Sequence, residues 1–210
     1  MTSHIINNQL VDFNSPEHHR AQMKARLEPI FNDMLLAMEL DPEATHLKGT
    51  PERMARMYID EIFVGLYSPK PRFTTFDNDT ESTSMVFLGN IDIFSTCSHH
   101  FKAFTGFAHI AYIPKRDGQL VGISKLARIA DWFARRPQVQ EVLTDEIADF
   151  LMHELDAAGV GVDISAVHNC IRVRGAKQSQ SIMNTTTLRG CFLKDKKVND
   201  EFMAKIERLT

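Results

Sequence analysis

Four segments rich in β-branched and aromatic residues constrain the fold of this chain more than any other feature. They come in two pairs, and a long stretch with helical periodicity separates the pairs. Side chains of these types suit the pleated surface of a sheet, and short segments of this kind joined by polar turns indicate antiparallel strands. The predicted strands cover residues 85–96, 105–114, 160–174 and 183–193.

Two helices are predicted between the strand pairs. In the segment 122–136, apolar residues recur on one face and Pro137 ends the helix. A second helix follows over 138–158, and a short amphipathic helix closes the chain. This order predicts an α+β fold, with an antiparallel four-stranded sheet and two helices on one face. The open edges of such a sheet favour oligomers.

The N-terminal third is predicted to be a helical extension. Ser15 and Pro16 are typical of a helix start, and that helix runs to about residue 40. Thr50 begins a second helix that ends near Gly65. The predicted organisation is a mobile arm over 1–14, a helical region over 15–67 and an α+β domain over 68–210.

Composition excludes several classes of protein. The 210 residues are 43% hydrophobic and 24% charged, and no segment approaches the roughly 20 apolar residues that span a bilayer. A net charge of −3 argues against a nonspecific nucleic-acid binder, which needs a basic excess. The N-terminus lacks the basic flank and apolar run of a secretory signal, so we expect a cytoplasmic protein with reduced thiols.

The cysteines suggest a metal site. Three widely spaced cysteines suit metal binding or catalysis better than a disulfide framework. In Cys97-Ser98-His99-His100, a thiol and an imidazole three residues apart can converge on one ion where the chain turns after a strand. Taken alone, this segment also fits a solvated turn beside a small buried cysteine.

A second cluster falls on the predicted strand 160–174. Alternate residues of a strand share a face, so His168, Cys170, Arg172 and Arg174 are predicted to lie on one side. An imidazole, a thiol and two guanidiniums suit the wall of a site that holds a metal and an anionic ligand.

Together the two clusters predict a zinc site, one ion per subunit, with the ligands Cys97, His100 and Cys170. Three protein ligands leave a tetrahedral position for water, whose pKa zinc lowers to about 7. His99 and His168 lie beside these ligands and are the predicted proton carriers. Cys191 is the alternative fourth ligand, which would close the site and make it structural.

Two further groups suit a nucleotide. Ser124, Lys125 and Arg128 begin the helix 122–136, where free amides and the helix dipole favour a phosphate, although an ordinary cationic helix face is the alternative. Gln140 and Glu141 lie in the first turn of the next helix. A carboxylate can accept two hydrogen bonds from the N1 and N2 edge of guanine, but the dipole also favours a carboxylate there without a ligand.

These motifs resemble those of the GTP cyclohydrolase I family, and the match extends over residues 17–205. The matching motifs are Thr50-Pro51-x-Arg53, Cys97-x-His99-His100, Gly122-Ile123-Ser124-Lys125-Leu126-x-Arg128, Arg136-Pro137-Gln138-Val139-Gln140-Glu141, and His168-x-Cys170 with Arg174-Gly175.

The resemblance implies a tunnelling-fold subunit of a toroidal homo-oligomer, commonly a decamer, with active sites between subunits. It implies that GTP loses formate and rearranges to 7,8-dihydroneopterin triphosphate. Zinc would bind Cys97, His100 and Cys170, while His99 and His168 would move protons.

The resemblance also implies a set of substrate contacts. Glu141 would hold guanine with help from Gln140. The ribose triphosphate would face Ser124, Lys125, Arg128 and Arg174, and two further basic positions match Arg53 and Arg56.

The sequence departs from the family pattern at two positions. Ser98 replaces a customary Glu, which bears on the local proton-transfer network, and Asn169 replaces a residue that is commonly apolar or aromatic. One alternative is a related tunnelling-fold nitrile reductase that uses a nucleophilic cysteine and NADPH. Another is a cyclohydrolase-like ring that binds zinc and nucleotide without turnover. The two-cysteine metal pattern argues against the first, and the presence of His99, His168 and Glu141 argues against the second.

Overall fold

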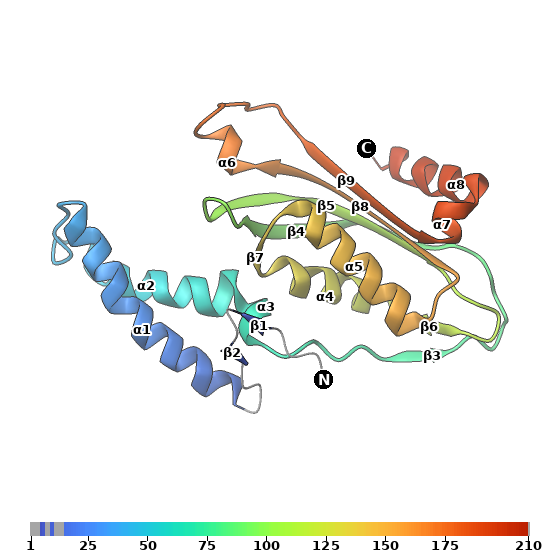
Figure 1. The fold of residues 1–210 in the computed structure, drawn as a ribbon, viewed down its shortest axis with the longest axis horizontal. Coiled ribbons are helices and arrows are strands. Elements are labelled where there is room, and N and C mark those ends of the chain that lie inside the picture. Colours follow the sequence, from blue (N-terminus) through green and yellow to red (C-terminus); the bar gives the residue numbers. More distant parts are fainter. Residues whose placement is uncertain (1–4, 7–8, 11–14, 210) are drawn as a thin grey trace. The chain divides into compact units, whose positions relative to one another are not determined.

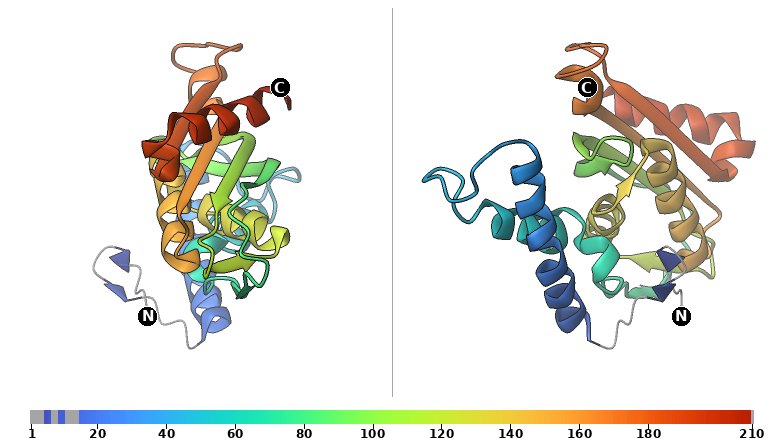
Figure 2. Two further views of the ribbon diagram at one scale, coloured as in Figure 1. Left: turned by 90° about the vertical axis from the view of Figure 1, so that its right-hand side faces the viewer. Right: turned by 60° about the vertical axis from the view of Figure 1, so that its left-hand side comes forward.

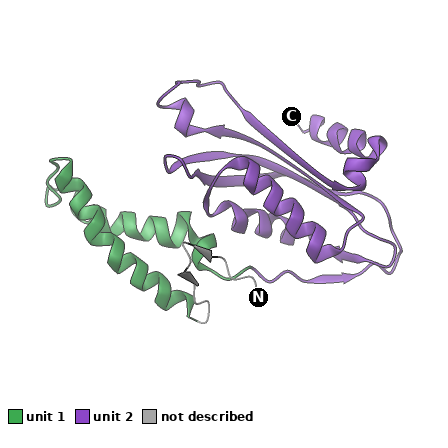
Figure 3. Cartoon of the chain, viewed as in Figure 1, with its two compact units in different colours: residues 1–70 green, residues 71–210 purple. Residues whose placement is uncertain are grey.

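The computed structural model of the chain describes residues 5–6, 9–10 and 15–209. It divides into two compact units, residues 1–70 and 71–210 (Figure 3). Much of the predicted arm over 1–14 lies outside the described residues, and within it β1 (Ile5–Ile6) pairs antiparallel with β2 (Gln9–Leu10). No helix in the described part of the chain combines the length and the hydropathy needed to cross a membrane.

The first unit is helical. Its first helix, α1 (Pro16–Ala37), begins with a proline in the first turn, where the missing N–H costs no hydrogen bond. The predicted second helix over 50–65 is divided into three pieces, namely α2 (Thr50–Arg56), the π-helix η1 (Met57–Ile62) and α3 (Val64–Tyr67). The helix is divided because its hydrogen bonding changes: the N–H of Phe63 donates to the carbonyl of Tyr58, five residues back, as in a π-helix. Arg20 and Lys24 of α1 both pair with Asp60 of η1.

The second unit is built on one large sheet, whose strand order is β7-β4-β5-β8-β9 (Figure 1). Its four long strands are antiparallel, namely β4 (Val86–Cys97), β5 (Lys102–Ile113), β8 (Gly159–His168) and β9 (Met183–Gly190). The short β7 (Pro137–Gln138) adds a fifth strand, parallel to β4. A separate ribbon pairs β3 (Thr75–Asp77) with β6 (Gln119–Val121).

Helices cover the sheet unequally on its two faces (Figures 1 and 2). On one face, α4 (Ile123–Ala134) and α5 (Gln140–Leu155) bury the main apolar core. On the other face, α7 (Cys191–Lys194) and α8 (Lys196–Glu207) enclose a smaller core around Phe192 and Phe202. The predicted α+β class, with an antiparallel sheet and two helices on one face, is confirmed, and the strand β7 is an addition to it.

The predicted strand over 160–174 is too long. It ends at His168, and residues 169–172 form the single helical turn α6 (Asn169–Arg172). The neighbouring strand explains this end, because His168 pairs with Phe104 near the start of β5 and the chain before β5 is a turn. Because β5 begins only two residues before Phe104, pairing beyond His168 could continue for two residues at most, and the chain instead turns into α6. The predicted alternation of Cys170, Arg172 and Arg174 on one strand face is therefore wrong.

The predicted strand over 183–193 also ends early, at Gly190. This glycine has a φ of +60°, and a Cβ there would lie 2.2 Å from the carbonyl oxygen of Ala158. Only glycine fits this position, and the chain turns there into α7. The turn places Cys191 beside Gly159, where β8 begins.

Candidate functional site

Cys97 is the last residue of β4 and is buried. It is held between two strands, since it pairs with Lys102 of β5 and with Gln138 of β7. The chain then turns through residues 98–101, which are exposed. The sulfur of Cys97 lies 3.7 Å from Nδ1 of His99 in this turn.

Cys170 approaches Cys97 from the helical turn α6. The ligand atoms of Cys97, His168 and Cys170 all lie within 4.8 Å of one another. Burial raises the pKa of the Cys170 thiol, and the neighbouring Cys97 sulfur raises it further. Two thiolates this close repel each other, and a divalent cation between them would remove that repulsion, so the group has the chemistry of a metal site. Its burial and mixed sulfur and nitrogen donors suit zinc.

His168 is the imidazole that the structure brings to the two sulfurs. It is buried, its Nδ1 lies 4.0 Å from the sulfur of Cys170, and its Nε2 lies 2.8 Å from Oε1 of Gln140. Burial lowers the pKa of His168, and the charge of Glu141 partly offsets this effect. A neutral imidazole beside two thiols can accept a proton or bind a metal ion.

A cavity of about 210 Å³ opens beside these groups. Its lining combines the sulfurs and imidazoles with the start of α5 and the loop before β9, and consists of Cys97, His99, Val139, Gln140, Glu141, His168, Cys170, Ile171, Ser181 and Met183. Glu141 is exposed in the first turn of α5, so its carboxylate is available to a ligand. The predicted residues His99, Gln140 and Glu141 therefore share one cavity with the Cys97–Cys170 pair.

His100 is placed differently. It is exposed in the turn after β4, and it belongs neither to the group of close ligand atoms nor to the lining of the cavity. The structure thus puts His168, rather than His100, nearest to the two sulfurs.

Cys191 is remote from this group. Cys191 begins α7 and lies beside Gly159, the first residue of β8, whereas His168 is the last residue of that strand. The strand has ten residues, and at about 3.3 Å per residue its ends are about 30 Å apart. Cys191 therefore cannot complete a metal site with Cys170 of the same chain.

The predicted anion-binding residues lie outside the lining of the cavity. Ser124, Lys125 and Arg128 occupy the first two turns of α4, with Ser124 and Arg128 exposed. Arg174 follows α6 and is also exposed. Arg53 and Arg56 are exposed on α2 in the first unit, where Arg53 donates to the carbonyl of Lys48 and to the hydroxyl of Thr50.

Some residues around the site were missed by sequence reasoning. The ring of Phe104 stacks on that of His168, with centroids 4.5 Å apart. Ser181 and Met183 line the cavity, and Thr185 contacts Gln140. The only local signal was that Met183 and Thr185 alternate on the predicted last strand, which does not indicate a site.

Comparisons with known proteins agree with the motifs. The sequence model of the family described as GTP cyclohydrolase I matches residues 27–207. The GTP cyclohydrolase 1 of Mycolicibacterium vanbaalenii is 43% identical over 185 residues, covering 88% of this chain and 91% of the relative. The GTP cyclohydrolase 1 of Mycobacterium tuberculosis is 44% identical over 169 residues, covering 80% of this chain and 82% of the relative. A solved structure, the archaeosine synthase QueF-Like in the apo form, is 16% identical with a TM-score of 0.43 and covers 52% of this chain and 96% of its own. The family match spans most of the chain, which therefore belongs to the GTP cyclohydrolase I family.

Proposed function

We propose that the protein converts GTP into 7,8-dihydroneopterin triphosphate and formate. Two hydrolytic cleavages of the imidazole ring release C8 as formate, and the ribose then opens, rearranges and closes a new ring with loss of water. The observation that carries this proposal is the convergence of Cys97, Cys170 and His168 beside a cavity, in a chain of the GTP cyclohydrolase I family.

Zinc is the proposed metal, held by the thiolates of Cys97 and Cys170 and by one imidazole. The resemblance favours His100 as that imidazole, whereas the geometry brings His168 within 4.8 Å of both sulfurs. When bound, zinc supplies an activated water at neutral pH. With His100 as the ligand, His168 and His99 are left to carry protons at the edge of the cavity.

The substrate is proposed to enter with guanine at the start of α5. The carboxylate of Glu141 accepts hydrogen bonds from the N1 and N2 edge of guanine, which adenine cannot donate. Ser124, Lys125, Arg128 and Arg174 supply hydroxyl and cationic groups for the ribose triphosphate, with Arg53 and Arg56 as further cationic contacts. These side chains lie outside the lining of the cavity within one chain. We therefore propose a homo-oligomer, a decamer by family resemblance, in which neighbouring subunits complete each site.

The thiolates of Cys97 and Cys170 must stay reduced to bind a metal ion. This requirement supports the proposal that the protein works in the cytoplasm.

The test of the proposed function is turnover of GTP. Purified protein supplied with zinc should release one formate per GTP and give a product that fluoresces as a neopterin after oxidation. The His168→Ala variant should give neither signal, and His153→Ala, at an exposed position of α5, should match the wild type. Zinc-loaded protein that binds GTP without either product would instead support a non-catalytic ring, to which Ser98 would contribute.

A further inference from the structure

Gln140 is completely buried although it begins α5. Its amide nitrogen lies 2.9 Å from the carbonyl oxygen of Ile164, 3.0 Å from that of Met183 and 3.1 Å from the hydroxyl of Thr185. Carbonyl oxygens only accept hydrogen bonds, so the nitrogen end of the amide has to face them. A flipped amide would set its oxygen against two carbonyl oxygens, which fixes the orientation of this side chain.

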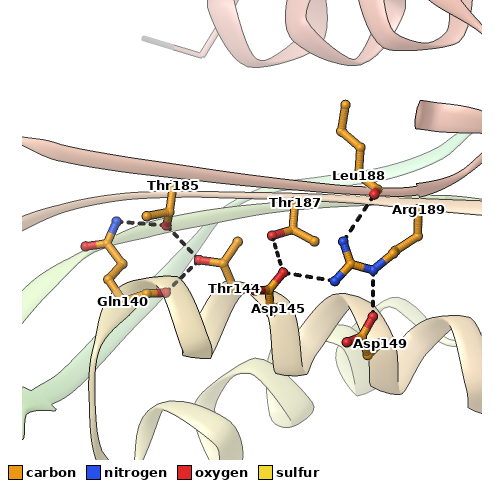
Figure 4. Close-up of polar contacts among 8 residues, drawn as sticks. All are labelled: Gln140, Thr144, Asp145, Asp149, Thr185, Thr187, Leu188 and Arg189. Carbon is orange, nitrogen blue, oxygen red and sulfur yellow. Dashed lines mark hydrogen bonds and ion pairs between the residues drawn. The ribbon is translucent and has the colours of Figure 1, made fainter. Parts of the chain in front are cut away.

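Two threonines make the arrangement directional (Figure 4). The hydroxyl of Thr144 donates to the main-chain carbonyl of Gln140 at 2.8 Å and lies 2.6 Å from the hydroxyl of Thr185. Because Thr144 has used its single proton, Thr185 donates to Thr144 and is left to accept from the amide of Gln140. The hydrogen bonds form a closed ring that ties the first turn of α5 to β9.

The amide oxygen of Gln140 consequently faces Nε2 of His168, at 2.8 Å. An oxygen that only accepts requires a proton on Nε2. Neutral His168 is then protonated at Nε2, and its Nδ1 keeps a free lone pair on the side of Cys170, whose sulfur is 4.0 Å away. The stacked ring of Phe104 holds the plane of the imidazole, since the two rings are 6° from parallel.

We infer that Gln140 is a positioning residue, which fixes the tautomer of His168 so that Nδ1 faces the two cysteines. Three acceptors already surround the two amide hydrogens, so the amide has no proton left for a purine. Gln140 therefore acts on the reaction through His168 and not by holding guanine. The effect on turnover rests on the proposed function, whereas the tautomer can be measured without it.

The first experiment reads the tautomer directly. Full-length, zinc-supplied protein is labelled with ¹⁵N-histidine and sedimented for solid-state NMR, and the His168 signals are those missing from His168→Gln. We expect the Nε2 signal of neutral His168 to be that of a protonated nitrogen and the Nδ1 signal to be that of a nitrogen without a proton. A proton on Nδ1 of the wild type would overturn the inference, and no variant has to fold for this result.

The second experiment uses Gln140→Met, which keeps the length of the side chain and removes its polar atoms. We expect an Nδ1-protonated population of His168 to appear, and kcat for GTP to fall about 10- to 100-fold with KM within about twofold, as for other residues that orient a functional histidine.

The matched control is Thr187→Val, which removes a buried hydroxyl that donates to Asp145 in the same contact between β9 and α5. It should leave the tautomer and kcat unchanged. A raised KM with unchanged kcat in Gln140→Met would show that Gln140 binds substrate, and an unchanged tautomer would equally contradict the inference. If the wild type does not turn over GTP, the proposed function fails while the NMR result still decides the role of Gln140.

Discussion

The rings of Phe104 and His168 lie 4.5 Å apart and 6° from parallel, with Phe104 fully buried beneath the imidazole. An aromatic pair contributes about 0.5–1.5 kcal/mol beyond the area it buries, and this pair also restricts how the imidazole can tilt. We expect Phe104→Leu to lower the free energy of unfolding by about 1–2 kcal/mol and to lower kcat for GTP several-fold.

The control for this prediction is Phe192→Leu, which removes an equally buried ring from the smaller core on the opposite face of the sheet. It should cost similar stability and leave kcat unchanged. Denaturant unfolding and steady-state kinetics separate the two effects. Equal kcat in both variants would mean that the stacked ring only fills the core.

If the thiols of Cys97 and Cys170 bind the metal ion, substituting either one should change the metal content of the protein. Cys97→Ser and Cys170→Ser should each lose bound zinc, because a hydroxyl is a much poorer zinc ligand than a thiolate. Cys191→Ser should keep full zinc content, since Cys191 is at the far end of β8. Metal analysis of the dialysed proteins measures this directly, and zinc loss in Cys191→Ser would refute the geometry.

The third ligand can be found in the same way. If His100 binds the ion, His100→Ala should lose zinc and His168→Ala should retain it. The opposite outcome would assign the ion to the imidazole that lies within 4.8 Å of both sulfurs. Whichever imidazole binds the ion, Gln140 of the wild-type protein should remain hydrogen-bonded to His168.

Local patterns were sufficient to predict most elements of the fold. The apolar face of α4, with Leu126, Ile129 and Phe133, is buried as its helical spacing predicts. The end of β8 could not be predicted in the same way, because it depends on where β5 stops supplying a neighbour. Residues 169–174 continue the alternating pattern of a strand, so the sequence alone carries no signal for the turn that brings Cys170 to the site.

The site shows the same limit. The convergence of cysteine and histidine side chains could be proposed from residue types, but the role of Gln140 could not. Its position in the first turn beside Glu141 suggests substrate binding, whereas its actual partners are 24 to 45 residues away in the sequence. Phe104 likewise is indistinguishable from any other apolar residue of a strand.

Arg136 is a buried cation, and removing the carboxylate that balances its charge should lower the stability of the fold. Its guanidinium lies 4.0 Å from the centre of the Trp132 ring and 3.5 Å from the carboxylate of Glu146, while its Nε and Nη2 have no hydrogen-bond partner among the described residues. Burial lowers the pKa of Arg136, and Glu146 partly offsets the effect. Because Glu146 is partly exposed, we expect Glu146→Gln to cost about 1–2 kcal/mol, less than the 3–5 kcal/mol of a fully buried pair.

Two further variants test whether the buried charge of Arg136 depends on Glu146. Adding Arg136→Met to Glu146→Gln should recover part of the stability, because the unpaired charge is removed. Breaking the surface pair between Asp131 and Arg135 with Asp131→Asn should cost at most about 0.5 kcal/mol. Urea unfolding of the variants gives these differences, and no recovery in the double variant would show that Arg136 stabilises the fold by packing alone.

His109 should make the stability of the second unit depend on pH. It is buried on β5, accepts a hydrogen bond from the backbone N–H of Asn90 and stacks on Phe87. Burial lowers the pKa of His109 below its ordinary value of 6.5, and Asp163 on the adjacent strand partly offsets the effect. The native protein therefore takes up a proton at His109 less readily than the unfolded chain does.

The sign of the pH effect follows from this difference. Well above pH 6.5, at about pH 7.5 and higher, His109 is almost entirely unprotonated in both states, and its contribution to stability is fully present. As the pH falls from 6.5 through the lower native pKa, the unfolded chain binds the proton first, so stability is lost and then levels off. We expect the stability difference between wild type and His109→Gln to shrink between pH 7.5 and pH 5.5. Urea unfolding midpoints of the two proteins measure this difference in stability. EDTA removes bound metal and the protein concentration is kept fixed, so that the pH dependence of the metal ligands and of His168 is the same in both proteins. Parallel pH curves for the two proteins would show that the imidazole of His109 does not resist protonation in the native state.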